Sequence, residues 1–322
     1  MLDPYTKPPA ALREIYKRLH KLSVVDICND SEIIDLQALD QMSKSRVCEV
    51  SLLMLHPRLP EAFGEFAGSP CEPTKAFVVY EVSRLPGLFV YPNFLPRDGQ
   101  LQILAKTFHR DLSNPQHLTN VHTHYDVPTT SFGSSYFSPA AQDLVFSPRD
   151  PAVHKPISTG QFLDKKLRWL TLGGQYDWTN KIYPAGPPPP FPPDVKQLVE
   201  TLFPMKAEAA IVNLYSPGDT LSLHRDVSEE CDQALVSISL GCEGIFLVGL
   251  DDDRAVTLRL RSGDAVLMSG ESRYAWHGVP KVLAGTCPKW MQDWPAGDGE
   301  YEAWSGWMAG KRINLNVRQM FN

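Results

Sequence analysis

The sequence predicts a mainly β protein with flanking helices, whose core is a double-stranded β-helix (jelly roll) over about residues 208–322. Two observations support this fold class. After residue 208, short apolar segments follow one another at near-regular spacing, with few helical patterns between them. Turn residues separate several of these segments, as at Pro217-Gly218 and Gly263-Asp264. We expect strands at 209–215, 220–226, 234–241, 244–250, 255–261, 264–269, 273–279 and 312–319.

The bulk composition limits the class of protein. The 322 residues include 31 basic and 37 acidic side chains, a net charge of −6, so any nucleic-acid contact must come from a local basic patch. The six cysteines are scattered without a Cys-x-x-Cys pair and indicate reduced thiols. No apolar run reaches the length of a membrane span, and no secretory signal is visible. We expect an intracellular monomer without membrane contact, in the nucleus and cytoplasm, with the mitochondrion as an alternative.

Residues 1–80 are expected to form an N-terminal extension, helical and partly irregular, ahead of a domain that spans 81–322. A helix is predicted over 10–22, where apolar residues recur at helical spacing among basic ones. We expect it to dock on the domain; the alternative is a mitochondrial targeting segment, against which Asp3 and Glu14 argue. A second helix is predicted over 31–42, and the Pro-punctuated stretch 44–80 is expected to be partly irregular.

The next stretch supplies elements that flank the core. The apolar run that ends at Pro92-Asn93 predicts a buried strand, and a helix follows over 100–112. Residues 113–160 indicate a long loop. His122 and His124 in this loop lack a third ligand at suitable spacing, so we expect no metal there.

Further segments prepare or interrupt the core strands. An aromatic strand or strand pair is predicted over 167–178, and the proline run 184–193 indicates a rigid connector. A helix is expected over 194–203, capped by Asp194. The Trp-, Gly- and Pro-rich segment 284–311 indicates an insertion packed over the barrel.

The first candidate functional residues follow the Pro-Gly turn. Alternation in a strand places His224 and Asp226 on one face, about 7 Å apart at their Cα atoms. His277, at the end of a later predicted strand, would complete a facial set of two histidines and one carboxylate, as in non-haem Fe(II) oxygenases. The alternative for His224 and Asp226 alone is an exposed polar strand face.

The last predicted strand carries the second candidate site. Alternation places Arg312, Asn314, Asn316 and Arg318 on one face. Two arginines there would bind a small dianion, because a guanidinium matches the geometry of a carboxylate. A co-substrate with two acidic ends that also chelates metal is indicated, and 2-oxoglutarate fits that description. The alternative is a solvated edge strand.

The order of these motifs resembles the AlkB family of Fe(II)/2-oxoglutarate dioxygenases over roughly residues 85–322. The likeness is carried by Asn-x-Tyr-x-x-Gly, His-x-Asp, Ser-Leu-Gly, Gly-Glu-Ser-Arg, His-Gly and Arg-x-Asn-x-x-x-Arg-Gln. LRWLTLGGQYDW, the proline run and the insertion before the last strand are similar to the eukaryotic homologue-1 type. The resemblance implies O2 as a further co-substrate, oxidation of 2-oxoglutarate to succinate and CO2, and loss of an N-methyl group as formaldehyde.

The resemblance also implies roles for individual residues. The Fe(II) ligands and catalytic residues would be His224, Asp226 and His277. Arg312 and Arg318 would hold the two carboxylates of 2-oxoglutarate. Its remaining polar contacts would come from Asn213, Tyr215 and Asn314.

Substrate residues are predicted with alternatives. Trp169, Tyr176 and Trp178 are candidates for a platform that stacks a flipped base, and ordinary core aromatics are the alternative. Arg273 is a candidate phosphate contact. Ser228 stands where the bacterial type has an acid near the base, and Glu229 or Glu230 is a candidate substitute.

The function expected from these residues is oxidative demethylation of N-methylated nucleobases, such as N1-methyladenine, in tRNA or DNA. It would serve DNA repair or tRNA modification, with nucleic acid as the partner. One alternative is an oxygenase of the same fold that acts on a protein or histone side chain. Another is a catalytically idle barrel that binds nucleic acid. A zinc hydrolase would leave the two arginines of the last strand without a use.

Overall fold

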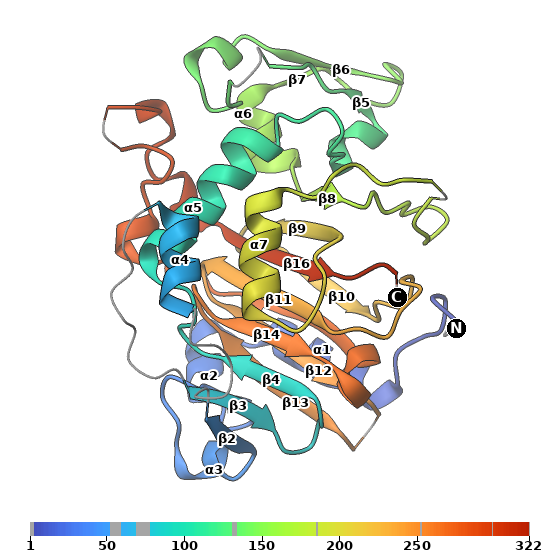
Figure 1. Ribbon diagram of the computed structural model, residues 1–322, viewed down its shortest axis with the longest axis vertical. Coiled ribbons are helices and arrows are strands. Elements are labelled where there is room, and N and C mark those ends of the chain that lie inside the picture. Colours follow the sequence, from blue (N-terminus) through green and yellow to red (C-terminus); the bar gives the residue numbers. More distant parts are fainter. Residues whose placement is uncertain are drawn as a thin grey trace.

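The computed structural model describes residues 3–51, 59–68, 78–130, 134–184, 186–251, 253–297 and 299–321. Two sheets pack against each other to form the core, in agreement with the predicted jelly roll (Figure 1). The larger sheet has the order β2 (Val47–Ser51), β3 (Val78–Val82), β4 (Leu88–Tyr91), β14 (Ala265–Met268), β11 (Leu235–Gly241), β16 (Arg312–Arg318), β9 (Ala209–Tyr215) and β8 (Trp169–Gly173).

The smaller sheet has the order β1 (Ile33–Ile34), β13 (Ala255–Leu260), β12 (Gly244–Gly249), β15 (Trp276–Val282) and β10 (Leu221–His224). Alternation along β12 divides its side chains between two layers. Phe246 and Val248 join the core shared with the larger sheet, while Ile245 and Leu247 pack on the other face.

The outer face of the smaller sheet is covered by the N-terminal helices α1 (Ala10–Lys21) and α2 (Val24–Asn29). Leu12 and Leu19 of α1 are fully buried in a cluster with Ile245 and Trp276. The helix predicted over 10–22 is therefore confirmed. Its apolar side contacts the sheet.

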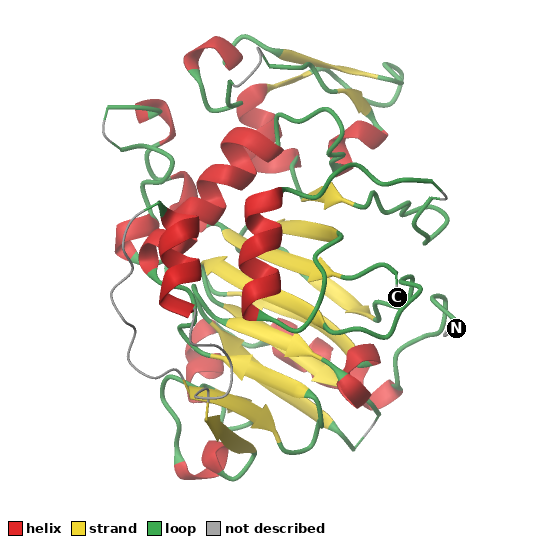
Figure 2. Ribbon diagram, viewed as in Figure 1, coloured by secondary structure: helices red, strands yellow, loops and turns green. Residues whose placement is uncertain are grey.

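The helices drawn in red on the near side of Figure 2 lie over the larger sheet. They are α4 (Leu59–Ala67), α5 (Arg97–Ala105) and α7 (Pro193–Leu202), and α5 continues as a π-helix, η2 (Lys106–Asp111). The helix predicted from residue 100 thus begins three residues earlier. The N-cap of α7 is Pro192; the carboxylate of Asp194 instead binds Arg110, so the predicted cap is corrected.

One expectation for the N-terminal part is wrong. The helix predicted over 31–42 is replaced by strand β1, a turn and the short helix α3 (Gln41–Lys44). Asp30 and Asp35 accept hydrogen bonds from backbone N–H groups two residues later, which competes with helix formation. Ile33 and Ile34 then pair in parallel with β13. The stretch 44–80 is only partly irregular, since its described residues include β2, α4 and the start of β3.

The loop expected at 113–160 holds more structure than predicted. A small sheet of β5 (Tyr125–Asp126), β6 (Val145–Pro148) and β7 (Ile157–Ser158) lies within it. Short helical segments flank this sheet: η3 (Asn120–Thr123), η4 (Pro139–Ala141), α6 (Thr159–Gln161) and η5 (Phe162–Lys166). The segment 167–178 supplies one strand, β8, which ends at Gly173 with a positive φ of 64°.

The segment 284–311 contains the short helices η7 (Lys289–Met291), η8 (Glu302–Trp304) and η9 (Trp307–Gly310). Its tryptophans Trp294, Trp304 and Trp307 all pack edge-on against Phe137, and Trp294 and Trp307 also pack on Phe108 of η2. The insertion is thereby fixed to the helical side of the molecule by aromatic contacts.

Two strand boundaries near the candidate site differ from the prediction. The strand expected at 273–279 begins only at Trp276, because residues Gly270–Tyr274 form a 3-10 turn, η6. Strand β10 ends at His224, so Asp226 lies beyond it; the carbonyl of Asp226 accepts a hydrogen bond from Arg273 in place of a strand neighbour. Among the described residues, no helix has the length and apolar character needed to cross a membrane.

Candidate metal and co-substrate site

Two antiparallel strands place two histidines opposite each other. The register of β10 and β15 sets the Cα of His224 against that of His277, and the ring centroids lie 4.3 Å apart. Gly278 permits this close pairing, because a Cβ at its position would lie 2.7 Å from the carbonyl oxygen of Leu221 on β10. The strand pair therefore brings together two imidazoles that are distant in the sequence.

Backbone carbonyls fix the orientation of both imidazoles. Nδ1 of His224 lies 2.9 Å from the carbonyl oxygen of Ser222, and Nδ1 of His277 lies 3.1 Å from that of Ala275. A carbonyl oxygen only accepts, so Nδ1 of each ring carries a proton, and in the neutral imidazole Nε2 then keeps its lone pair. Burial, together with the neighbouring His224, lowers the pKa of His277 to about 4 and keeps that ring neutral. Both Nε2 atoms are therefore available to bind a cation.

Asp226 completes the cluster. Its Oδ1 lies 3.9 Å from Nε2 of His224 and its Oδ2 lies 3.7 Å from Nε2 of His277. One ligand atom from each residue lies within 4.8 Å of the other two. Burial would raise the pKa of Asp226, but Arg318 and the two histidines hold it below its usual range, so the carboxylate is ionised. This donor set, two imidazoles and a carboxylate, fits a non-haem Fe(II) ion.

A buried network of ion pairs and hydrogen bonds holds Asp226 in position. Arg318 donates to the Asp226 carboxylate at 3.1 Å and to Glu229 at 3.2 Å. Arg273 donates to the carbonyl of Asp226 at 2.8 Å and to Glu229 at 3.0 Å. Glu229 thus pairs with two arginines. Arg318 contacts the carboxylate of Asp226, and Arg273 contacts its backbone carbonyl. Glu229 is one of the two candidates, with Glu230, to replace an acid near the base; the structure gives the Glu229 carboxylate this supporting position.

The face of β16 holds buried polar atoms that lack a partner within the described part of the chain. The side chain of Arg312 is buried, and its Nη2 donates to Ser239, but its Nε and Nη1 have no partner. The hydroxyl of Tyr215 also lacks a partner, and the Tyr215 ring centroid lies 5.4 Å from Cζ of Arg312. A buried guanidinium without a paired carboxylate is unfavourable. An anionic ligand would satisfy Arg312 and Tyr215 together, which fits one end of 2-oxoglutarate.

The amides predicted to contact the co-substrate lie beside this face. Asn314 and Asn213 are direct partners across β16 and β9. Nδ2 of Asn314 donates to Ser237 at 2.7 Å, which fixes that amide, and Asn213 lines a pocket above the metal cluster. The structure therefore brings the five predicted co-substrate residues onto adjacent strands.

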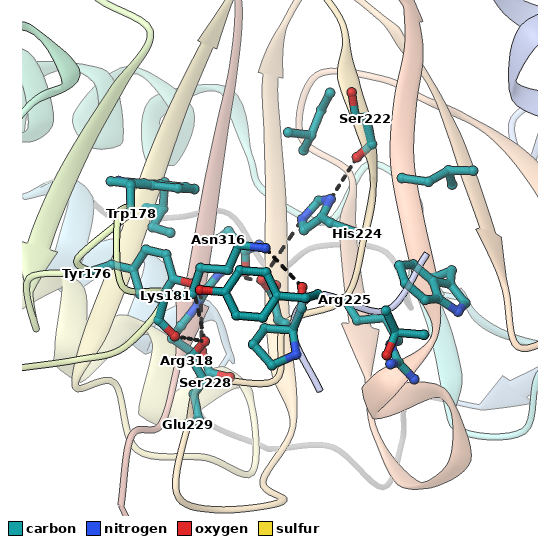
Figure 3. A pocket seen from close by; sticks show the side chains of 18 of the residues that line it. Tyr176, Trp178, Lys181, Ser222, His224, Arg225, Ser228, Glu229, Asn316 and Arg318 are labelled. Carbon is teal, nitrogen blue, oxygen red and sulfur yellow. Dashed lines mark hydrogen bonds and ion pairs between the residues drawn. The ribbon is translucent and has the colours of Figure 1, made fainter. Parts of the chain in front are cut away.

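A pocket of about 400 Å³ opens over the metal cluster (Figure 3). His224, Asp226 and Arg318 belong to its wall, and Tyr176 and Trp178 lie on one side of it. Trp178 packs against the ring of Tyr176 at 4.9 Å and against that of Trp169 at 5.1 Å, measured between centroids. The three predicted platform aromatics therefore form one cluster, of which Tyr176 and Trp178 reach the pocket.

Ser228 and Arg273 have structural contacts that the sequence did not reveal. Ser228 lines the pocket, donates a hydrogen bond to the carbonyl of Lys181 at 2.9 Å, and accepts one from the Tyr176 hydroxyl at 3.2 Å. It thus anchors the loop that carries both aromatics. Arg273 is 1% exposed and its guanidinium is engaged by Gln233, Asp226 and Glu229, so the predicted phosphate contact is wrong.

Two basic pocket residues were missed by the sequence reasoning. Arg225 lies between two metal-site residues, and its guanidinium packs over Trp276 at 4.5 Å. Lys181 reaches the pocket from the loop after β8. The only local signal was the basic character of Arg225 and Lys181, because their positions depend on contacts between distant segments.

The fold and site define a class, the Fe(II)- and 2-oxoglutarate-dependent oxygenases. The sequence matches the 2OG-Fe(II) oxygenase superfamily over residues 87–318. A protein of Pyricularia oryzae named N6-methyladenosine RNA demethylase ALKB1 is 45% identical over 99% of this chain and 98% of its own length. The chain belongs to the 2OG-Fe(II) oxygenase superfamily, in its AlkB branch, and is an enzyme of that class.

Two further relatives show the same likeness. A Cryphonectria parasitica protein named N6-methyladenosine RNA demethylase ALKBH is 55% identical over 62% of this chain and 99% of its own length. A Schizosaccharomyces pombe protein named tRNA demethylase abh1 is 37% identical over 83% of this chain and 88% of its own. The resemblance to the AlkB family, and to its homologue-1 type, is thus confirmed.

Proposed function

We propose that the protein oxidatively demethylates N-methylated adenine in RNA, with N6-methyladenosine as the first base to test. The observation that supports catalysis is the cluster of His224, Asp226 and His277, two of which line the pocket, together with the buried guanidinium of Arg312, whose Nε and Nη1 have no partner among the described residues. The observation that supports RNA is that two relatives, which match 99% and 83% of this chain, are named an N6-methyladenosine RNA demethylase and a tRNA demethylase.

The residues have distinct roles in this proposal. His224, Asp226 and His277 would hold Fe(II). Arg312 and Tyr215 would bind one carboxylate of 2-oxoglutarate, and Arg318 would bind the other beside the metal. Bound Fe(II) would couple the oxidation of 2-oxoglutarate by O2 to hydroxylation of the N-methyl group, which then leaves as formaldehyde.

The pocket supports a flat aromatic substrate. Tyr176 and Trp178 lie together on one side of the pocket, and Trp276 is a third aromatic residue that lines it. Because the metal cluster lies at the floor, a base must be unpaired or flipped out of its stack to reach it. Ser228, whose hydroxyl already has two partners, holds the aromatic loop in place during this step.

The proposal is tested with Fe(II)-loaded protein, 2-oxoglutarate and oxygen. Succinate and formaldehyde are measured with a single-stranded RNA that carries one N6-methyladenosine and with the same RNA unmethylated. We expect methylated RNA alone to stimulate both products in equal amount. Formaldehyde without preference for the methylated strand would contradict the proposal.

Parallel samples separate the other candidates. An N1-methyladenine tRNA stem-loop, a methylated DNA strand and a methylated histone peptide are assayed in the same way. The tRNA stem-loop is the second candidate, because the Schizosaccharomyces pombe relative is named a tRNA demethylase. Stimulation by the peptide alone would assign the protein-directed oxygenase, and RNA binding without any succinate would assign the idle barrel.

A further inference from the structure

The residues Asp3–Thr6 form a compact turn at the mouth of the pocket. All four line the pocket wall, although the nearest core element of their own segment begins at Ala10. The carboxylate of Asp3 accepts a hydrogen bond from the backbone N–H of Tyr5 at 2.8 Å, and the Asp3 carbonyl accepts one from that of Thr6 at 3.3 Å. We call this turn the strap.

Two cations of the pocket wall hold the strap by its backbone. Nζ of Lys181 donates to the carbonyl oxygen of Pro4 at 3.0 Å and lies 4.0 Å from the centre of the Tyr5 ring. Nη2 of Arg225 donates to the carbonyl oxygen of Asp3 at 3.4 Å. Lys181 comes from the aromatic loop and Arg225 from the strand end between His224 and Asp226. The strap therefore bridges two separate walls above the metal cluster.

These two cations differ from the third one in the pocket. Arg318 is ion-paired with Asp226 and Glu229. Within the described part of the chain, neither Lys181 nor Arg225 has a carboxylate within ion-pair distance. Their partners are neutral carbonyl oxygens, which interact less strongly with a cation than charged oxygens do. Nε of Arg225 is buried and has no hydrogen-bond partner among the residues that the structure describes.

The strap itself is weakly attached. All four of its residues are exposed, and the Tyr5 side chain is 64% exposed although its ring contacts a cation. None of the four belongs to either hydrophobic core cluster. Displacement of the strap would therefore cost only a few exposed polar contacts.

We propose that Lys181 and Arg225 bind the phosphates on either side of a base that enters the pocket, and that the strap occupies these cations until RNA displaces it. This inference rests on the proposed RNA substrate. A phosphate oxygen carries charge and makes a stronger bond to each cation than a carbonyl oxygen does. The strap thus competes with RNA for the two cations. It selects against RNA strands that cannot place a phosphate at both Lys181 and Arg225.

The test is the affinity of oxygen-free, Fe(II)- and 2-oxoglutarate-loaded full-length protein for a fluorescent single-stranded RNA, measured by anisotropy at several salt concentrations. In the strap variant, Asp3→Gly, Pro4→Ser, Tyr5→Gly and Thr6→Ser are combined, which keeps the chain length. We expect this variant to bind RNA about three- to tenfold more tightly than wild type, because both cations are released. Asp3→Asn is the matched control: it removes the same negative charge but keeps the turn, and we expect less than a twofold change.

A second variant tests the role of the cation Lys181 independently of the strap. Lys181→Ala should weaken RNA binding and lower the slope of log affinity against log salt by about 1, as expected for one lost phosphate contact. In the Lys181→Ala background the strap replacement should give a smaller gain than in wild type. An unchanged salt slope would reject the phosphate role.

The outcomes distinguish the strap from the proposed substrate. Unchanged or weaker RNA binding by the strap variant would overturn the strap as a competitor while leaving RNA as substrate. If Asp3→Asn increased RNA affinity as much as the strap variant does, the effect would come from the lost negative charge. This result would also overturn the strap as a competitor. If neither wild type nor any variant bound RNA, while the same proteins in separate samples with oxygen still consumed 2-oxoglutarate, the RNA substrate itself would be rejected, and the roles of Lys181 and Arg225 with it.

Discussion

Nη2 of Arg318 lies 3.1 Å from Oδ2 of Asp226, so the central strand of the larger sheet is ion-paired to the metal cluster of the smaller one. This contact joins the two candidate sites into one. The same guanidinium also contacts Glu229, which keeps the arginine paired when Asp226 engages a cation. A change in either carboxylate should therefore affect metal binding and co-substrate binding together, but to different extents.

The first prediction concerns the metal carboxylate. Asp226→Asn should lower succinate formation at least about a hundredfold, because an amide is a poor Fe(II) ligand and loses the negative charge that balances the ion. The fold should persist, since Glu229 still pairs with Arg318. Bound iron, succinate and the unfolding temperature are measured together. Asp232→Asn, at an exposed position nearby, is the control and should retain iron and activity; normal iron content in Asp226→Asn would refute the ligand assignment.

The second prediction concerns the space around Arg312. A Cβ at Gly244 would lie 2.5 Å from Nε of Arg312, so Gly244→Ala should displace the guanidinium. The KM for 2-oxoglutarate should rise about tenfold, with a smaller change in kcat. Gly249→Ala on the same strand is the matched control. Its Cβ would meet Leu12 of α1 at 2.7 Å, so it should cost stability without raising the KM.

The third prediction concerns the buried acid beneath the site. Glu229 contacts Arg273 and Arg318, and the side chains of all three are at most 4% exposed. Glu229→Gln removes the charge shared by two buried cations and should lower the free energy of unfolding by about 3–5 kcal/mol. Chemical denaturation measures this loss. Glu230→Gln, at the exposed neighbouring position, should change it by less than about 0.5 kcal/mol; equal losses in both variants would argue against the network.

The fourth prediction is a pH dependence of stability. Burial lowers the pKa of His109 to about 4, and its ring stacks on Tyr301 with centroids 4.8 Å apart. The unfolded chain binds a proton at His109 near pH 6.5, whereas the folded chain does so only near 4. His109 therefore contributes stability that is present above pH 6.5 and is lost as the pH falls towards 4.

The measurement is the free energy of unfolding between pH 7 and pH 4 for wild type and His109→Phe. We expect the wild type to lose about 1–2 kcal/mol more than the variant over this range, after allowance for the partial exposure of the ring. At pH 7 the variant should be slightly less stable, because it loses the hydrogen bond between Nδ1 and Ser135. Parallel pH profiles would exclude His109 as the titrating group.

The sequence predicted the parts of the site that depend on short-range periodicity. Alternation over Arg312–Arg318 correctly placed the two arginines and two asparagines on one face, because a regular strand leaves no other arrangement. The pairing of His224 with His277 was predicted from the motifs that contain them. The structure explains this pairing by the register of β10 and β15.

The parts that could not be predicted depend on contacts between distant segments. In the sequence, Arg273 resembled a surface cation. In the folded chain its guanidinium is buried, because it donates hydrogen bonds to Glu229 and to the carbonyl of Asp226. The helix predicted over 31–42 does not form. Ile33 and Ile34 instead form a strand, because they pair with the edge of β13. No local pattern relates Pro4 to Lys181, so the strap became visible only in the folded chain.

The buried guanidinium of Arg312, whose Nε and Nη1 lack a partner among the described residues, links the stability of the fold to the supply of co-substrate. A ligand that binds only the folded chain stabilises it by RT ln(1 + [L]/Kd), about 2.7 kcal/mol when its concentration is one hundred times Kd. The empty protein contains a buried positive charge that 2-oxoglutarate would compensate. The steady-state amount of folded enzyme should therefore follow the supply of its co-substrate, so that a fall in 2-oxoglutarate lowers both turnover and the lifetime of the protein that performs it.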